Sequence, residues 1–283
     1  MPNYEPLWHW IKAREIVRTR KDFGQPQPWT DDPILATYRF CNVRREDDRG
    51  TIWIRKNIRE PYAGHPYLWL MLCIARQINW PDTLGDLIFN GAWPDRATFD
   101  PREMTIVLNR RKDRGDKVYT GAYMISAPAT KGADKQSYIA ETVIGALWDR
   151  RESFRFAGKS LQRTHDWISR SNGWGPFMAY QAVVDMRFTA LLQDADDVQS
   201  WAAAGPGTIR GLNRLHGRAV TAALPQDQAL SEMRAIYNIV QAETGVPMDF
   251  SDVPNILCET DKYLRVKLGE GKPRALYVVG RGS

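Results

Sequence analysis

Residues 38–51 (YRFCNVRREDDRGT) mix arginines, carboxylates and an asparagine in one short segment. If the segment is helical, Asn42, Arg45 and Arg49 share one face, since they stand at positions i, i+3 and i+7. Such a group can bind a phosphate or orient a carboxylate. The competing interpretation is a solvated helix end with surface ion pairs, and composition alone favours it.

Residues 172–176 (NGWGP) predict a glycine-rich turn ahead of a helix over 177–191. Two glycines one residue apart allow a tight turn with outward amide groups, and such turns and helix N-termini bind phosphate. DNA-binding helix-hairpin-helix elements use a similar turn, although any helix–helix connection can use glycine. We assign DNA contacts to Gly173, Trp174, Gly175 and, in the lysine-bearing loop 126–136, Lys131.

An acidic cluster of Asp194, Asp196 and Asp197 follows this turn. A carboxylate near a bound base is a candidate general base, whereas the alternative is a polar turn with N-cap aspartates. Further on, Arg210 and Arg214 are four residues apart, so they share a helix face and can clamp a phosphate.

Two more polar groups stand on predicted helices. Glu259, Lys262 and Tyr263, at i, i+3 and i+4, indicate either a buried polar cluster or an exposed pair. Gln181 and Asp185 lie one turn apart among apolar residues, so if buried they form a structural pair or part of a pocket. Residues 269–274 (GEGKPR) are not a nucleotide-binding P-loop, because no strand precedes them and no Ser or Thr follows the lysine.

The elements that must position these residues are predicted to be helices. Apolar residues recur at helical spacing, and Asp-Pro pairs at 32–33 and 100–101 predict helix starts. We expect helices over 66–80 (central and buried), 102–114, 137–150, 177–191, 228–241 and a last one ending near Gly269. Loops are expected over 19–30 and 126–136, and only 117–125 and 275–279 read as short extended pieces. The sequence predicts an all-α fold in one catalytic domain, 1–283, with two lobes as a variant.

Composition narrows the class of protein. The net charge of +6 and pI of about 9.2 suit a phosphate-bearing partner, although charge alone makes this roughly an even choice. Three cysteines and four histidines are scattered, so neither a disulfide framework nor a structural zinc site is expected. No segment has the apolar length of a membrane span and no signal pattern opens the chain, so we expect a cytoplasmic protein without membrane contacts.

Four motifs in order carry a family resemblance: residues 38–51, the segment from Gly175 to Asp185, the segment 205–213, and the segment from Cys258 to Tyr263. Together they resemble the bacteriophage alpha-glutamyl/putrescinyl-thymine pyrophosphorylases, or amino acid:DNA transferases. The same helical domain occurs in 5-hydroxymethyluracil DNA kinases. The resemblance spans roughly residues 35–270.

This resemblance implies a helical fold related to helix-hairpin-helix DNA glycosylases. It also implies that an upstream 5-hydroxymethyluracil DNA kinase activates the base in double-stranded DNA, and that this chain displaces pyrophosphate with an amino acid or polyamine in the cytoplasm of the infected host. The base would be flipped out of the duplex. No cofactor is implied, and magnesium stays open because acidic residues are available without a ligand spacing that requires it.

The candidate site residues divide into three roles beside the DNA contacts. The candidate proton acceptors, headed by the acidic cluster, are Asp194, Asp196, Asp197, Asp185 and Glu46. The candidate phosphate and pyrophosphate ligands are Arg44, Arg45, Arg49, Arg210 and Arg214. The candidate base pocket consists of Tyr38, Asn42, Tyr123, Gln181 and Tyr263.

Two alternatives from other classes remain. A helix-hairpin-helix DNA glycosylase would release a base, but no lysine stands at the hairpin, where Phe177 and Met178 follow the turn instead. A non-catalytic DNA-binding partner of a base kinase would show salt-dependent binding without turnover. Clustered Asp and Glu residues argue mildly against a pure binder.

Overall fold

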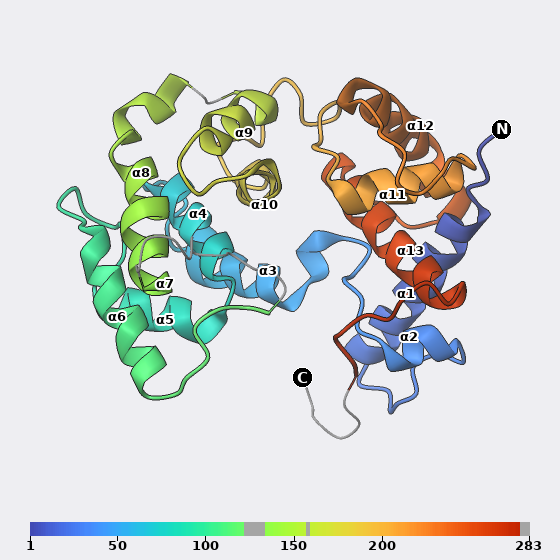
Figure 1. Ribbon diagram of the computed structural model, residues 1–283, viewed down its shortest axis with the longest axis horizontal. Helices are drawn as coiled ribbons and strands as arrows, with labels where there is room; N and C mark the ends of the chain where they lie inside the picture. The colour runs from blue at the N-terminus through green and yellow to red at the C-terminus, as the bar shows by residue number, and fades with distance from the viewer. Residues whose placement is uncertain (122–133, 157–158, 278–283) are drawn as a thin grey trace. The chain divides into compact units, whose positions relative to one another are not determined.

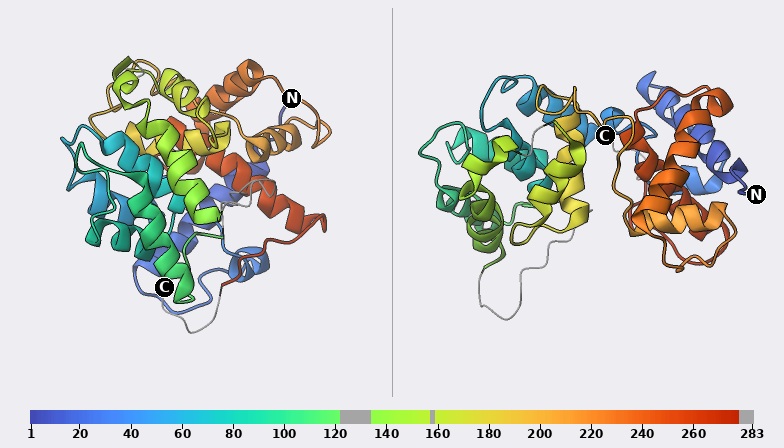
Figure 2. Two further views of the ribbon diagram at one scale, coloured as in Figure 1. Left: turned by 60° about the vertical axis from the view of Figure 1, so that its left-hand side comes forward. Right: turned by 90° about the horizontal axis from the view of Figure 1, so that it is seen from above.

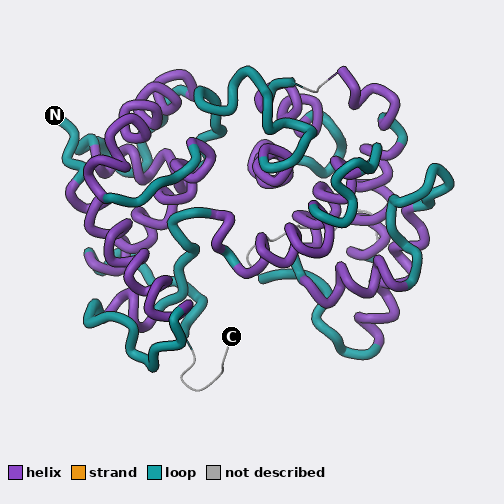
Figure 3. Tube along the Cα trace, turned by 180° about the vertical axis from the view of Figure 1, so that it is seen from behind, coloured by secondary structure: helices purple, strands orange, loops and turns teal. Residues whose placement is uncertain are grey.

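The computed structural model describes residues 1–121, 134–156 and 159–277 of the chain. Every regular element in this part is a helix, and the sole β-type pairing there is an isolated antiparallel bridge between Tyr38 and Leu276. Figure 3 shows the helices joined by loops, without a strand. The predicted all-α fold is therefore confirmed, while the relation to helix-hairpin-helix glycosylases stays a prediction.

The chain divides into two compact units. The terminal unit comprises Met1–Asp48 and Gln199–Ser283, and the central unit comprises Arg49–Val198. Whether both act as the single catalytic domain expected from the sequence stays a prediction, and each unit is described by itself.

The terminal unit is built around the last helix, α13 (Val253–Lys267). Helix α1 (Glu5–Asp22) and helix α11 (Pro206–Leu215) both pack against it, so that the first and the last helix of the chain lie side by side (Figures 1 and 2). The other elements of this unit are α2 (Pro33–Thr37), the 3-10 helix η1 (Arg45–Asp47), α12 (Gln226–Thr244) and the 3-10 helix η6 (Phe250–Asp252).

The core of the terminal unit contains Trp10, Phe250 and Leu257, which are fully buried. A capping box holds the start of η6, which leads directly into α13: Asp249 accepts a hydrogen bond from the Ser251 amide, and the Asp252 carboxylate accepts one from the Asp249 amide at 2.9 Å. The caps orient α13, on which the polar residues of the sequence motifs stand.

The central unit surrounds helix α4 (Leu68–Ile78), in which every residue is buried as the apolar sequence predicts. Helix α10 (Pro176–Arg187) packs on both α4 and α9 (Leu161–Ser169). The remaining elements are α3 (Arg49–Ile54), the π-helix η2 (Arg55–Arg59), α5 (Pro81–Phe89), α6 (Pro101–Asp113), α7 (Lys135–Ser137), the π-helix η4 (Tyr138–Ile144), α8 (Gly145–Trp148) and the 3-10 helix η5 (Arg151–Phe156).

Predicted helix starts are confirmed where a side chain caps the helix. The Asp32 carboxylate accepts hydrogen bonds from the amides of Ile34 and Leu35, and Asp100 accepts one from the amide of Arg102. Each satisfies amide donors that the first helical turn leaves free.

Three predicted boundaries are wrong. Helix α1 continues to Asp22, into the loop expected over 19–30, and α10 ends at Arg187 rather than at 191. The helix expected over 137–150 is a π-helix followed by one α-helical turn. Apolar spacing fails here because it hardly distinguishes i→i+4 from i→i+5 hydrogen bonding.

Candidate phosphate and acid–base site on helix α13

Helices α11 and α13 cross closely because glycine stands twice on the contact face of α11. A Cβ atom on Gly211 would lie 2.9 Å from the carbonyl carbon of Leu257, and one on Gly207 would lie 3.2 Å from the Cβ atom of Cys258. Such distances exclude a larger side chain without movement of a helix. The glycines therefore bring the arginines of α11 within reach of α13.

Asp261 of α13 organises these arginines. Its carboxylate is fully buried and accepts hydrogen bonds from Nε of Arg210 at 2.9 Å and Nε of Arg214 at 2.8 Å. Arg265, one turn further along α13, places its Nε atom 3.7 Å from the same carboxylate. Arg214 also pairs with Glu270, which raises the pKa of Arg214. This group, Arg210, Arg214, Arg265, Asp261 and Glu270, is called the arginine cluster below.

Glu259 of α13 anchors the first sequence motif. Its nearly buried carboxylate accepts a hydrogen bond from the Cys41 amide at 2.9 Å and forms an ion pair with Lys262 at 2.5 Å. The Lys262 ammonium lies 4.5 Å from the centre of the Phe40 ring, a cation–π contact. These contacts fix the beginning of segment 38–51 to α13.

The rest of that segment folds as a loop around Asn42. The Asn42 side chain accepts a hydrogen bond from Arg14 at 2.5 Å, and its backbone oxygen accepts one from Asn255 at 3.0 Å. The backbone amide of Asn42 donates to the Asp48 carboxylate at 2.8 Å. The helical face expected for Asn42, Arg45 and Arg49 is wrong, because the chain turns through η1 before α3 begins at Arg49.

Two carboxyls of this region have a raised pKa. Burial raises the pKa of Asp48 to about 6 and that of Asp252 to about 7. Asp252 accepts backbone hydrogen bonds from Arg45 and Asp249, so it holds η1 and η6 in place. Asp48 accepts a backbone hydrogen bond, from Asn42, on one oxygen only. It is therefore a better candidate than Asp252 for proton transfer near neutral pH.

The cysteines offer no activated nucleophile. Cys41, Cys73 and Cys258 are free thiols. Burial raises the pKa of Cys258 to about 11, and the nearby Glu259 carboxylate adds to the shift. The reactive thiolate form is therefore disfavoured at neutral pH.

Several predicted residues of the terminal unit lie in this region. Arg210 and Arg214 share a helix face, as expected, and converge on Asp261. Arg44 forms an ion pair with Asp47 at 2.7 Å. Tyr38 is half-buried at the bridge to Leu276, and Glu46 is partly buried on η1. Thus the segments 38–48, 205–214 and 258–265 meet around α13.

The expected place of Tyr263 in a base pocket needs a correction. Its ring is 4% exposed, and its hydroxyl donates to the Asp32 carboxylate at 2.6 Å. Asp32 in turn caps α2, so Tyr263 ties two helices together and has no open face for a base.

The remaining predicted residues belong to the central unit, where two carboxylates have structural positions. Asp185 is fully buried and holds Arg76 through two hydrogen bonds. Asp197 accepts from the Ser160 hydroxyl at 2.7 Å and from the amides of Leu161 and Gln162, which makes it a cap of α9. Neither is open to a substrate. Asp194, Asp196 and Arg49 are exposed, and Gln181 is almost fully buried.

The glycine-rich turn joins α9 and α10, but its tryptophan is buried. Trp174 is 4% exposed and donates its indole hydrogen to the Val143 carbonyl at 3.0 Å, so it cannot stack on a base there. Gly173 has φ of 79°, and a Cβ atom would lie 3.2 Å from the Cβ atom of Val143. Both Gly173 and Gly175 are exposed. The predicted Tyr123 and Lys131 lie outside the described residues.

Sequence reasoning missed Asp48, Asp261 and Arg265 as site residues. The only local signal was the spacing of Asp261 and Arg265, which stand at i and i+4 on one helix. Their partners on α11 are 47 and 51 residues away from Asp261, a separation that periodicity cannot bridge.

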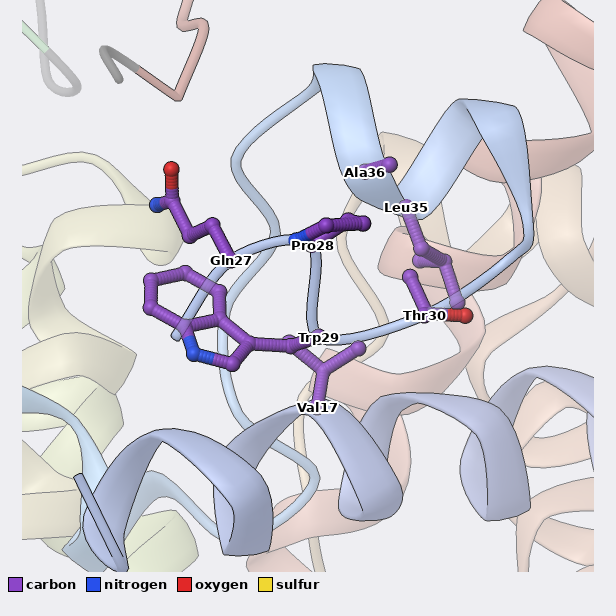
Figure 4. Close-up of a pocket in the computed structure, with 7 residues that line it drawn as sticks. All are labelled: Val17, Gln27, Pro28, Trp29, Thr30, Leu35 and Ala36. Atoms are coloured by element: carbon purple, nitrogen blue, oxygen red, sulfur yellow. The ribbon is translucent and has the colours of Figure 1, made fainter. Parts of the chain in front are cut away.

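Other kinds of site find no support within the described ranges. No group of three or more His, Cys, Asp or Glu side chains is arranged there to hold a metal ion. None of the helices described has the length and apolarity to cross a membrane. A pocket of about 230 Å³ opens beside α1 and α2 (Figure 4) and contains none of the predicted site residues; it is lined by Val17, Gln27, Pro28, Trp29, Thr30, Leu35 and Ala36.

Comparison with known proteins identifies relatives of nearly the whole chain. Residues 2–273 match the family described as 5-hmdU DNA kinase, helical domain. The chain is 27% identical over 220 residues to the 5-hmdU DNA kinase of Bacillus phage SP10, in an alignment that covers 71% of this chain and 34% of that kinase. The chain thus corresponds to about a third of this relative. No solved structure matches it.

Proposed function

Since this chain belongs to the family of 5-hmdU DNA kinase helical domains, we propose that it acts on modified thymine in DNA. More specifically, we propose an amine:DNA transferase that works after a 5-hydroxymethyluracil kinase. The family match over residues 2–273 supports the part of this proposal that names DNA as the substrate and a modified thymine as the base. The convergence of three motif segments on α13 supports a site for chemistry there.

The reaction replaces pyrophosphate on the 5-methylene carbon of the base. An amine nitrogen of an amino acid or polyamine forms the new C–N bond, the C–O bond breaks, and its electron pair leaves with pyrophosphate. The amine also loses a proton, which needs an acceptor. A cationic environment stabilises the departing polyanion.

Asp48 is our proposed proton acceptor. It is partly buried, stands in the motif segment fixed to α13, and has a pKa raised to about 6 by burial. It is therefore ionised at neutral pH yet basic enough to accept a proton. Asp185 and Asp197 are set aside because each is committed to a structural partner, whereas Asp194, Asp196 and Glu46 remain the alternatives.

One observation favours a second function. The relative from phage SP10 is a kinase of which this chain matches 34%. In the second proposal the helical region recognises the modified base in DNA, and a separate kinase domain supplies phosphoryl transfer. It would bind DNA that contains 5-hydroxymethyluracil without turning it over.

The release of pyrophosphate separates the two proposals. Duplex DNA is first pyrophosphorylated by a kinase with labelled ATP and purified, and then incubated with this protein and a pool of amino acids and polyamines. The transferase predicts label release that depends on both protein and amine. Tight DNA binding without release would favour the recognition module, and release of free base would favour a glycosylase.

A further inference from the structure

The outer edges of two guanidinium groups in the arginine cluster make no hydrogen bond to the residues that the structure describes. Arg210 donates a hydrogen bond from Nε to Asp261, and its Nη atoms donate none to the described residues. Arg265 lies close to the same carboxylate and likewise has no such bond at its Nη atoms within the described part of the chain. Both side chains are about a third exposed, at 36% and 37%.

Arg214 has a different place in the cluster. It is 8% exposed and is held by Asp261 on one side and Glu270 on the other. It is therefore saturated and acts as part of the scaffold. Of the two arginines on α11, Arg210 is therefore the one that retains donors facing solvent.

The cluster carries a net positive charge. Three arginines oppose two carboxylates, Asp261 and Glu270, which leaves a formal charge of +1. The neighbouring Glu259 and Lys262 form a neutral pair. The Nε atom of Arg265 is buried and has no hydrogen-bond partner among the described residues, so this arginine is held less tightly and can adjust to a ligand.

We propose that Arg210 and Arg265, oriented by the buried carboxylate of Asp261, form a binding site for a phosphate oxyanion. Two planar guanidinium groups match the oxygens of a phosphate, and the hydrogen bond from Nε of Arg210 to Asp261 directs the outer donors of Arg210 towards the ligand. The inference rests on the proposed function for its ligand class. The phosphate comes either from the DNA backbone or from the pyrophosphoryl group.

Binding measurements with two probes test the site and identify the source. A short unmodified DNA duplex and inorganic pyrophosphate are each titrated into the full chain, and into Arg210→Ala and Arg265→Ala. We expect each variant to lose roughly ten-fold or more in affinity for the probe that the site binds. Arg234→Ala is the matched control, because it removes the same charge from an exposed arginine that donates to the Ser200 carbonyl.

Asp261→Asn distinguishes an oriented site from a diffuse positive charge. The substitution adds one unit of positive charge locally, so a diffuse attraction would bind phosphate more tightly. Our proposal predicts weaker binding, because the arginines lose the carboxylate that orients them. Since Asp261 is buried, thermal unfolding is measured in parallel, and the exposed Arg210→Lys variant gives a second test that does not disturb the core.

Each outcome decides the matter. Loss of duplex affinity alone assigns the site to the DNA backbone, and loss of pyrophosphate affinity alone assigns it to the pyrophosphoryl group. Unchanged affinity for both probes, a loss equal to that of Arg234→Ala, or no binding by the unmodified protein overturns the site. These binding measurements do not depend on turnover. A failed transferase assay therefore does not overturn the phosphate site, and a successful assay does not establish it.

Discussion

At the scale of single residues, the chemistry depends most on the carboxyl group of Asp48. Its pKa of about 6 places the change from acid to base just below neutral pH. As the proton acceptor it works only when ionised, so the rate should rise with pH up to about 6 and then level off.

We predict that Asp48→Asn lowers the turnover rate at pH 7 by roughly a hundred-fold, the usual size of a general-base contribution. The rise of rate between pH 5 and 7 should disappear with it. The measurement is the pH dependence of pyrophosphate release under single-turnover conditions. DNA affinity serves as the control, and a variant that keeps the wild-type pH profile would remove Asp48 from the mechanism.

Asp197 illustrates a carboxylate that serves structure. It accepts three hydrogen bonds at the start of α9, so Asp197→Ala should destabilise the protein by about 1–2 kcal/mol, the range for a lost N-cap. Asp196→Ala, on an exposed neighbour, should change the free energy of unfolding by less than about 0.5 kcal/mol. Urea denaturation of both variants compares them, and equal stability would contradict the capping role.

Single residues also show how far sequence reasoning reaches. The spacing of Arg210 and Arg214 is enough to place them on one helix face, and the structure confirms it. Their common partner Asp261 is a long-range contact, which no local pattern specifies. Asp194, Asp196 and Asp197 were predicted as proton acceptors because they are carboxylates. Residue type alone does not distinguish a carboxylate that caps a helix from one that acts as a general base.

At the scale of elements, the close crossing of α11 and α13 determines where the arginines stand. A methyl group at Gly211 would meet the backbone of Leu257, which cannot turn aside as a side chain can. The crossing should therefore be the part of the terminal unit most sensitive to small increases in size.

We predict that Gly211→Ala destabilises the protein by about 1–3 kcal/mol, as over-packing does. Gly85→Ala is the matched control, because Gly85 lies within helix α5 and a Cβ atom there meets nothing within 4 Å. That control should stabilise by up to about 1 kcal/mol through its higher helix propensity. Thermal unfolding of the two variants gives the comparison, and a neutral Gly211→Ala would mean that the helices can separate freely.

Elements that depend on local signals were predictable. Helix α4 is apolar on nearly every side and is buried throughout, and the caps at Asp32 and Asp100 are where the sequence places them. The loop of residues 38–48 was not predictable from local signals, because Arg14, Asn255 and Glu259 hold it from distant parts of the chain. Tertiary contacts overrode the helical spacing there.

At the scale of the whole molecule, the net charge of +6 favours association with a polyanion. If Arg210 contacts a backbone phosphate, Arg210→Ala should reduce the slope of log affinity against log salt concentration by about 1. Duplex binding measured at several salt concentrations provides that slope. An unchanged slope with lower affinity would show that Arg210 does not pair with a DNA phosphate.

The predicted residues divide between the two compact units: Asp194, Asp196 and Arg49 belong to the central unit, and Arg210 and Glu46 to the terminal one. The family match covers both units from residue 2 to residue 273. Sequence similarity therefore places both units in one family, whereas composition and periodicity supported only a helical, basic protein.

The most direct test of the proposed function is mass spectrometry of the nucleosides in treated DNA. DNA containing 5-hydroxymethyluracil is incubated with a matching kinase, ATP, this protein and a pool of amino acids and polyamines, and then digested. We predict a new nucleoside whose mass identifies an amine joined to the 5-methylene carbon, absent when this protein is omitted. If the digest contains only the pyrophosphorylated or unmodified nucleoside, with every amine present, the transferase proposal is contradicted.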